Sequence, residues 1–63
     1  MSIKAMRNKS GITQSQLARR LNIDRSTVAK WETGEAHPRA DKLMKLAKAL
    51  RCTVDELLKD EAP

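Results

Sequence analysis

The stretch Leu17-Ala18-Arg19-Arg20-Leu21-Asn22-Ile23-Asp24-Arg25-Ser26-Thr27-Val28-Ala29-Lys30-Trp31 decides the fold. Its apolar residues recur every three or four positions on both sides of residues 22–24, which predicts two amphipathic helices. Because only three residues separate them, the two helices must cross steeply. Ile23 is apolar, and we expect it to pack between the helices and fix their angle. The sequence therefore predicts a tightly connected helix pair over about 14–21 and 25–33.

The rest of the chain has the same helical periodicity. Strands are not expected, because the chain has one aromatic residue and no alternating β-branched pattern. Capping residues are expected at four helix starts: Ser2, Asp24, and the capping boxes Thr13–Gln16 and Thr53–Glu56. We predict an all-α fold of five helices, over about 2–10, 14–21, 25–33, 40–50 and 54–58. One domain then spans residues 1–58, and residues 59–63 form a short flexible tail.

Length and composition exclude several function classes. The 63 residues suffice for one domain and leave no material for a deep catalytic cleft or a large cofactor. Cys52 is the only cysteine, which excludes an internal disulfide and a cysteine-rich zinc site, and His37 stands alone in a loop. We therefore expect no enzymatic activity, no catalytic or metal-binding residue, no cofactor and no small-molecule ligand. No apolar run suits a signal peptide or a membrane span, so we expect a cytoplasmic protein without a membrane partner.

The charge is unevenly distributed along the chain. The formal net charge is +5, but residues 1–51 carry twelve basic and four acidic residues, whereas residues 52–63 carry one basic and four acidic residues. A basic body of this kind favours a polyanionic partner such as nucleic acid. The alternative is that the basic residues only keep a small protein soluble.

The helix over 25–33 has two unlike faces. On a helical wheel Val28 and Trp31 lie on one side, and the opposite side carries basic or short side chains: Arg25, Ser26, Ala29, Lys30 and Thr33. Glu32 lies at the margin of that side. A basic face with a small residue at its centre suits a major groove, because the backbone can approach the base edges closely. The alternative is an ordinary solvated helix face.

Three runs of residues carry a family resemblance: Gly11-Ile12-Thr13-Gln14-Ser15-Gln16-Leu17-Ala18, Leu21-Asn22-Ile23, and Ser26-Thr27-Val28-Ala29-Lys30-Trp31-Glu32-Thr33-Gly34. Together they resemble the phage repressor and Cro-like (XRE-type, lambda-repressor-like) helix-turn-helix family. The resemblance covers about residues 2–58, because two later segments resemble the last two helices of that family. These segments are Leu43-x-x-Leu46-Ala47-x-x-Leu50 and Thr53-Val54-Asp55-Glu56-Leu57-Leu58. It implies a five-helix domain of a prokaryotic or phage-encoded regulator, often a repressor. Such a domain binds double-stranded operator DNA, usually as a two-fold homodimer, to control transcription.

The resemblance also implies roles for individual residues. Base contacts from the helix over 25–33 are expected from Arg25, Ser26, Thr27, Ala29 and Lys30. Phosphate contacts are expected from Thr13, Gln14, Thr33 and Arg39. Arg7 and Glu32 match a pair that bridges the first and third helices of relatives, so we expect an ion pair there.

Two residues depart from the family pattern. Asn22 and Arg51 stand where glycine is common. Asparagine tolerates the left-handed geometry of such a turn, whereas Arg51 either adopts it at a cost or marks a helix that ends differently.

The rival functional interpretation is an antitoxin-like or adaptor module, in which the same fold binds a protein and DNA binding is secondary or lost.

Overall fold

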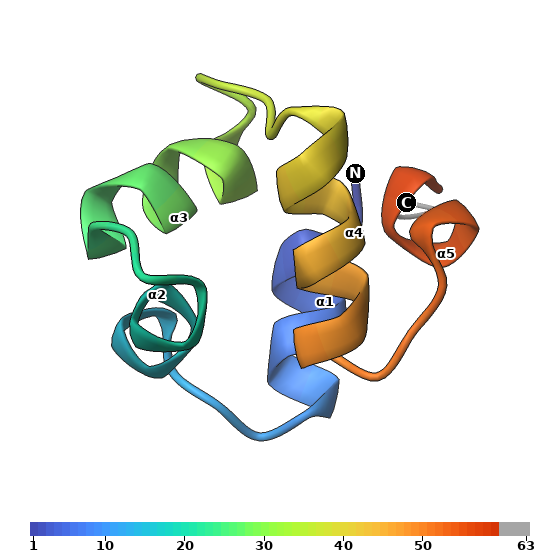
Figure 1. The fold of residues 1–63 in the computed structure, drawn as a ribbon, viewed down its shortest axis with the longest axis horizontal. Helices are drawn as coiled ribbons and strands as arrows, with labels where there is room; N and C mark the ends of the chain where they lie inside the picture. Colours follow the sequence, from blue (N-terminus) through green and yellow to red (C-terminus); the bar gives the residue numbers. More distant parts are fainter. Residues whose placement is uncertain (60–63) are drawn as a thin grey trace.

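The computed structural model describes residues 1–59, and this part of the chain contains five α-helices and no strand. They are α1 (Ile3–Lys9), α2 (Gln14–Leu21), α3 (Arg25–Thr33), α4 (Ala40–Ala49) and α5 (Val54–Leu58) (Figure 1). The predicted all-α fold is confirmed, and α1 and α4 are slightly shorter than expected. Residues 60–63, which we expected to belong to a flexible tail, lie outside the described residues.

Two helices begin with the capping boxes expected from the sequence. At α2 the backbone N–H of Gln16 donates to the hydroxyl of Thr13 at 3.1 Å, and the N–H of Thr13 donates to the Gln16 side chain at 2.8 Å. Thr53 and Glu56 repeat the arrangement at α5, at 3.1 and 3.0 Å. Each box satisfies two amide groups that a helix start would otherwise leave unpaired.

Three helices end in the same way. After α1, α2 and α4, one residue takes the left-handed conformation: Gly11 (φ 72°), Asn22 (φ 57°) and Arg51 (φ 55°). The next N–H then reaches back to a carbonyl in the last turn of the helix, as in a Schellman motif: Ile12 to Arg7, Ile23 to Ala18, and Cys52 to Ala47. Arg51 therefore adopts the strained geometry usually left to glycine.

Ser2 and Asp24 occupy the N-cap positions expected of them, but neither side chain makes a capping hydrogen bond. Ser2 is buried, and its hydroxyl donates to the carbonyl of Lys59 while its N–H donates to the carbonyl of Leu57 at 2.8 Å. Ser2 therefore fastens the start of α1 to the end of α5, and Lys59, which we expected in the tail, is held by this contact.

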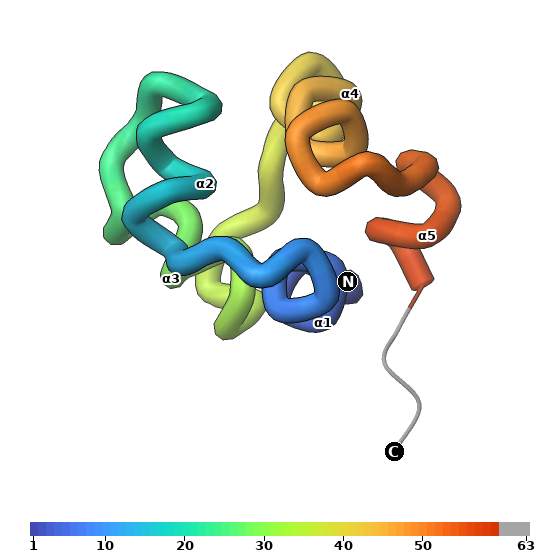
Figure 2. The backbone as a smooth tube through the Cα atoms, turned by 90° about the horizontal axis from the view of Figure 1, so that it is seen from below, coloured from blue at the N-terminus to red at the C-terminus, as the bar shows by residue number. Residues whose placement is uncertain are grey.

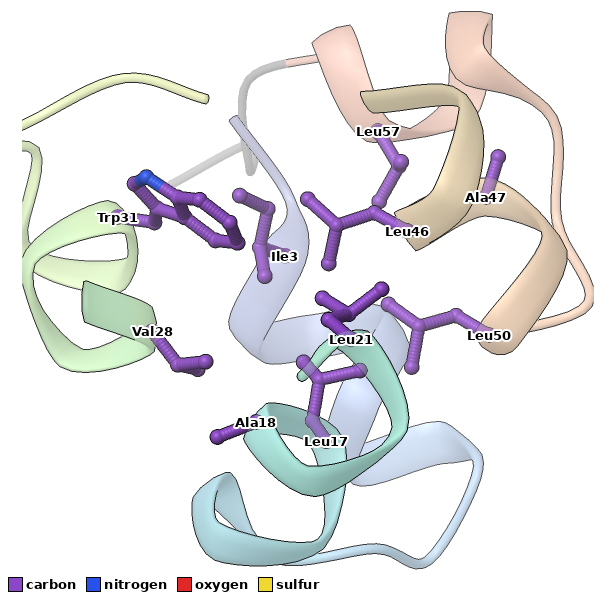
Figure 3. Packing of buried hydrophobic residues seen from close by; sticks show 10 residues of the cluster. All are labelled: Ile3, Leu17, Ala18, Leu21, Val28, Trp31, Leu46, Ala47, Leu50 and Leu57. Carbon is purple, nitrogen blue, oxygen red and sulfur yellow. The ribbon is translucent and has the colours of Figure 1, made fainter. Parts of the chain in front are cut away.

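The helices surround a single apolar core. In both views α2 and α3 lie at one end of the molecule and α5 at the other, with α1 and α4 between them (Figures 1 and 2). All five helices contribute to the core: Ile3, Leu17, Ala18, Leu21, Val28, Trp31, Leu46, Ala47, Leu50 and Leu57 (Figure 3). Val28 and Trp31 are 0% and 6% exposed, so α3 is fixed by one side and its opposite side faces solvent.

Candidate nucleic-acid interface

The solvent side of α3 holds the residues for which we expect base contacts. Arg25, Ser26 and Lys30 are exposed, and Thr27 and Ala29 are half-buried beside them. Because Val28 and Trp31 are buried in the core, the helix cannot rotate to hide these side chains. The side-chain ammonium group of Lys30 has no hydrogen-bond or ion-pair partner within residues 1–59, so its charge is available to a binding partner.

The one acidic residue of α3 is removed from this surface by an ion pair. Arg7 Nε donates to Glu32 Oε2 at 2.6 Å, and the two side chains are only 11% and 3% exposed. Arg7 Nη1 also donates to the carbonyl of Ile12 at 2.8 Å. This is the pair that the family resemblance indicated. It joins α1 to α3 and neutralises the carboxylate, so the exposed face of α3 keeps its positive sign.

Gln14 lies between the ion pair and Arg25. Its Nε2 donates to Glu32 Oε1 at 2.9 Å, and its Oε1 accepts from Arg25 Nη1 at 3.2 Å. A residue expected to bind phosphate is thus bonded to a residue expected to read a base. Sequence reasoning missed this link, because Gln14 and Arg25 meet only through the crossing of α2 and α3.

A hollow of about 490 Å³ opens at the start of α2, beside the first residue of α3. Its lining combines α1, the turn after it, and the first residues of α2 and α3: Arg7, Asn8, Gly11, Ile12, Thr13, Gln14, Ser15 and Arg25. The capping box occupies the N–H of Gln16, whereas the N–H groups of Gln14 and Ser15 have no bonded partner within residues 1–59. A helix start with free amides, next to Arg25, favours an anion.

Asn8 and Ser15 line the same hollow, and sequence reasoning did not single them out. The position of Ser15 in the first turn of α2, next to Gln14, is a signal that could have found it. No comparable signal exists for Asn8, because only the folded arrangement of the helices brings it to this hollow.

The remaining expected phosphate contacts lie outside this hollow. Thr33 is exposed at the end of α3, where its hydroxyl donates to the carbonyl of Lys30 at 3.2 Å. Arg39 is exposed and occupies the N-cap position of α4, at the end of the loop over 34–39. Neither residue lines the hollow that Thr13 and Gln14 share.

A second hollow of about 400 Å³ lies where α1, α2 and α4 end, and Lys9, Arg20 and Arg51 contribute its charge. Cations at helix C-termini interact favourably with the negative end of the helix dipole, which accounts for this cluster.

Within residues 1–59 no three His, Cys, Asp or Glu side chains gather around a point where a metal could bind. No helix of this range is long and apolar enough to cross a bilayer.

The comparisons with known proteins agree on one family. The model named Helix-turn-helix matches residues 3–57. The transcriptional activator BcrR of Enterococcus faecalis is 36% identical over 59 residues, which are 94% of this chain and 29% of that protein. Repressor protein C2 of Salmonella phage P22 is also 36% identical over 59 residues, 94% of this chain and 27% of that protein.

The transcriptional repressor RstR of a cryptic Vibrio cholerae phage is 40% identical over 45 residues, 71% of this chain and 40% of that protein. The chain thus spans less than a third of the length of BcrR and of C2. No solved structure matches it.

Proposed function

Because this chain belongs to the helix-turn-helix family, we propose that it binds double-stranded DNA sequence-specifically and regulates transcription. The observation that carries the proposal is the exposed side of α3. This side presents Arg25, Ser26 and Lys30 together, while Glu32 is neutralised by Arg7. The relatives are named as an activator and repressors, and regulators of this family are typically not enzymes.

In the proposed complex α3 lies in the major groove. Arg25 and Lys30 donate to guanine O6 and N7, and Ser26 bonds a neighbouring base edge. Thr27 and Ala29 touch thymine methyl groups or the adjacent backbone. Phosphates lie at Thr13, Gln14, Thr33 and Arg39, and the free amides at the start of α2 supply donors beside Thr13 and Gln14.

A homodimer on a palindromic operator is part of the proposal. The longest extent of the molecule is 28 Å, which is shorter than the ~34 Å between successive half-sites on one face of the duplex. One copy therefore reaches one half-site. Met44 on α4 and Leu58 on α5 are 68% and 48% exposed, and a second copy would cover such apolar surface.

The test is selection of bound duplexes from a random-sequence pool, followed by sequencing. We expect the wild type to enrich a two-fold symmetric sequence. Arg25→Ala should relax one position in each half-site and lose about 1–3 kcal/mol of discrimination there. Lys48→Ala, which removes the same charge from the exposed end of α4, is the control and should keep the wild-type profile.

Salt dependence adds a second measure of the same binding. With about eight phosphate contacts per dimer, the logarithm of the binding constant should fall with the logarithm of salt concentration at a slope of about −7. Failure to enrich any sequence, or equal profiles for Arg25→Ala and Lys48→Ala, would contradict the proposal. If the chain instead bound a protein partner, enriched no duplex, and bound DNA with an affinity that hardly changed with salt concentration, the adaptor alternative would be favoured.

A further inference from the structure

Four side chains form one continuous chain of hydrogen bonds from α1 to the first residue of α3. Arg7 donates to Glu32, Gln14 donates to Glu32, and Arg25 donates to Gln14, at 2.6, 2.9 and 3.2 Å. The chain begins inside the protein, where Glu32 is 3% exposed, and ends in solvent at Arg25. A buried carboxylate is thereby connected to a side chain that we expect to touch a base.

The direction of every bond in this chain is determined by its charged members. A carboxylate only accepts hydrogen bonds and a guanidinium only donates them, whereas the glutamine amide can do either at its two ends. Because Glu32 accepts from Gln14, the amide nitrogen of Gln14 points inward. Its carbonyl oxygen must then point outward, which is the orientation that Arg25 needs as a donor.

We propose that Glu32 is a positioning residue for base recognition. It selects the orientation of the Gln14 amide, and that orientation gives Arg25 an acceptor which holds the guanidinium in place before DNA arrives. An ordered arginine loses less side-chain freedom on binding than a mobile one, and it favours one base geometry over others. The inference rests on the proposed function, in which Arg25 reads a base.

The inference changes what is expected of Gln14. A residue that only bound phosphate would affect all DNA sequences about equally when removed. Since Gln14 also holds Arg25, Gln14→Ala should both weaken binding to every sequence and reduce the preference at the position that Arg25 reads.

The substitution Glu32→Gln isolates the orientation. The oxygen of the new amide still accepts from Arg7 Nε, so its nitrogen takes the place of Oε1 and faces Gln14. Arg7 Nη2, which donates to Oε1 at 3.3 Å in the wild type, loses its acceptor. Gln14 must then turn its oxygen inward, which points its own nitrogen at Arg25 and removes the acceptor. The size of the side chain at position 32 hardly changes, and no group that we expect on DNA is altered.

An exchange variant, which combines Gln14→Glu with Glu32→Gln, restores the matched donors and acceptors at positions 14 and 25, while Arg7 Nη2 still lacks its acceptor at position 32. The amide placed at position 32 accepts from Arg7 and donates to the carboxylate placed at position 14. The second oxygen of that carboxylate accepts from Arg25, and the net charge returns to that of the wild type. A carboxylate at position 14 repels phosphate, so binding to all sequences should weaken, while the preference that depends on Arg25 should return.

The experiment measures the ratio of affinities for the selected duplex and for a duplex changed only at the base pair that Arg25→Ala relaxes. A ratio cancels the effect of net charge, which acts on both duplexes alike. We expect Glu32→Gln to lower the ratio roughly two- to tenfold, the cost of immobilising one long side chain. The exchange variant should recover the wild-type ratio at lower affinity.

A purely structural role for Glu32 predicts a different outcome. Ser2→Ala is the control, because it removes the hydroxyl contact to Lys59 at the opposite part of the fold and should lower stability without changing the ratio. Trp31 fluorescence in urea reports whether each variant is folded. If Glu32→Gln does not fold, the exchange variant is compared with Gln14→Ala, which lacks an acceptor for Arg25 and should have the lower ratio.

The results separate the two claims. A folded Glu32→Gln with the wild-type ratio, or an exchange variant whose ratio is as low as that of Gln14→Ala, overturns the positioning role and leaves DNA recognition intact. A wild type that selects no sequence overturns the proposed function and this inference together.

Discussion

Arg51 is a residue with a Cβ in a backbone conformation that favours glycine. It takes a φ of 55° after α4, a conformation that costs residues with a Cβ about 1–2 kcal/mol. The side chain is exposed, and within residues 1–59 it has no bonded partner that would offset this strain. The family pattern of glycine at this position is therefore explained by the turn itself.

Arg51→Gly should raise the free energy of unfolding by about 0.5–1 kcal/mol. The gain is smaller than the strain removed, because glycine also makes the unfolded chain more flexible. Urea titrations followed by Trp31 fluorescence measure the change. Asn22→Gly is the matched control and should gain less, since asparagine tolerates φ 57° better than arginine tolerates φ 55°. A loss of stability in Arg51→Gly would show that the arginine side chain contributes more than its backbone costs.

Residues whose partners are near in sequence were the predictable ones. Asn22 in the turn, and Val28 and Trp31 in the core, follow from local turn chemistry and from helical periodicity. Ser2 occupies the expected N-cap position, but its bonds to Leu57 and Lys59 were not predictable, because these partners lie at the other end of the chain. Met44 is apolar and yet 68% exposed, and periodicity alone cannot say whether such a side chain faces the core or a partner.

At the scale of helices, the two capping boxes explain why α2 and α5 begin where they do. They use the same geometry, but Gln16 is neutral and Glu56 is charged. The N–H and the hydroxyl of Thr53 donate to the carboxylate of Glu56, and these bonds hold the pKa of Glu56 below its usual value of 4.5. The start of α5 should therefore respond to acid, whereas the start of α2 should not.

A carboxyl group with a lowered pKa in the folded state stabilises the fold above its unfolded pKa and loses that contribution as pH falls through the folded pKa. Between about pH 7 and about pH 3, we therefore expect the unfolding free energy of Glu56→Gln to decrease less than that of the wild type. Urea titrations at both values provide the measurement. Equal decreases in both proteins would mean that the charge of Glu56 makes no difference to the start of α5.

Helix bounds were predictable because caps and left-handed residues are local signals. The connection between Gln14 and Arg25 was not, although both residues were expected to bind DNA. It depends on the crossing of α2 and α3, which places the first residues of the two helices beside each other. The same crossing brings Gln14 to Glu32, and no spacing in the sequence indicates that contact.

At the scale of the whole molecule, the core determines which surface is available. Side chains from all five helices meet in it, and Val28 and Trp31 bury one side of α3 in the interior (Figure 3). The exposed side of α3 lies at the end of the molecule formed by α2 and α3, away from α5 (Figure 1). The basic body predicted a polyanionic partner and the helical wheel placed Arg25, Ser26 and Lys30 on one side of α3, and the packed fold leaves these three side chains exposed to solvent.

The most direct test is an NMR titration of the folded chain with the duplex that selection enriches. We expect backbone amide shifts to concentrate at the start of α2, around Gln14 and Ser15, and along α3 from Arg25 to Lys30. Amides near Met44 and Leu58 should change only where a second copy docks. Strong shifts confined to α4 and α5, with α3 unchanged at saturating DNA, would contradict the claim that α3 contacts the bases.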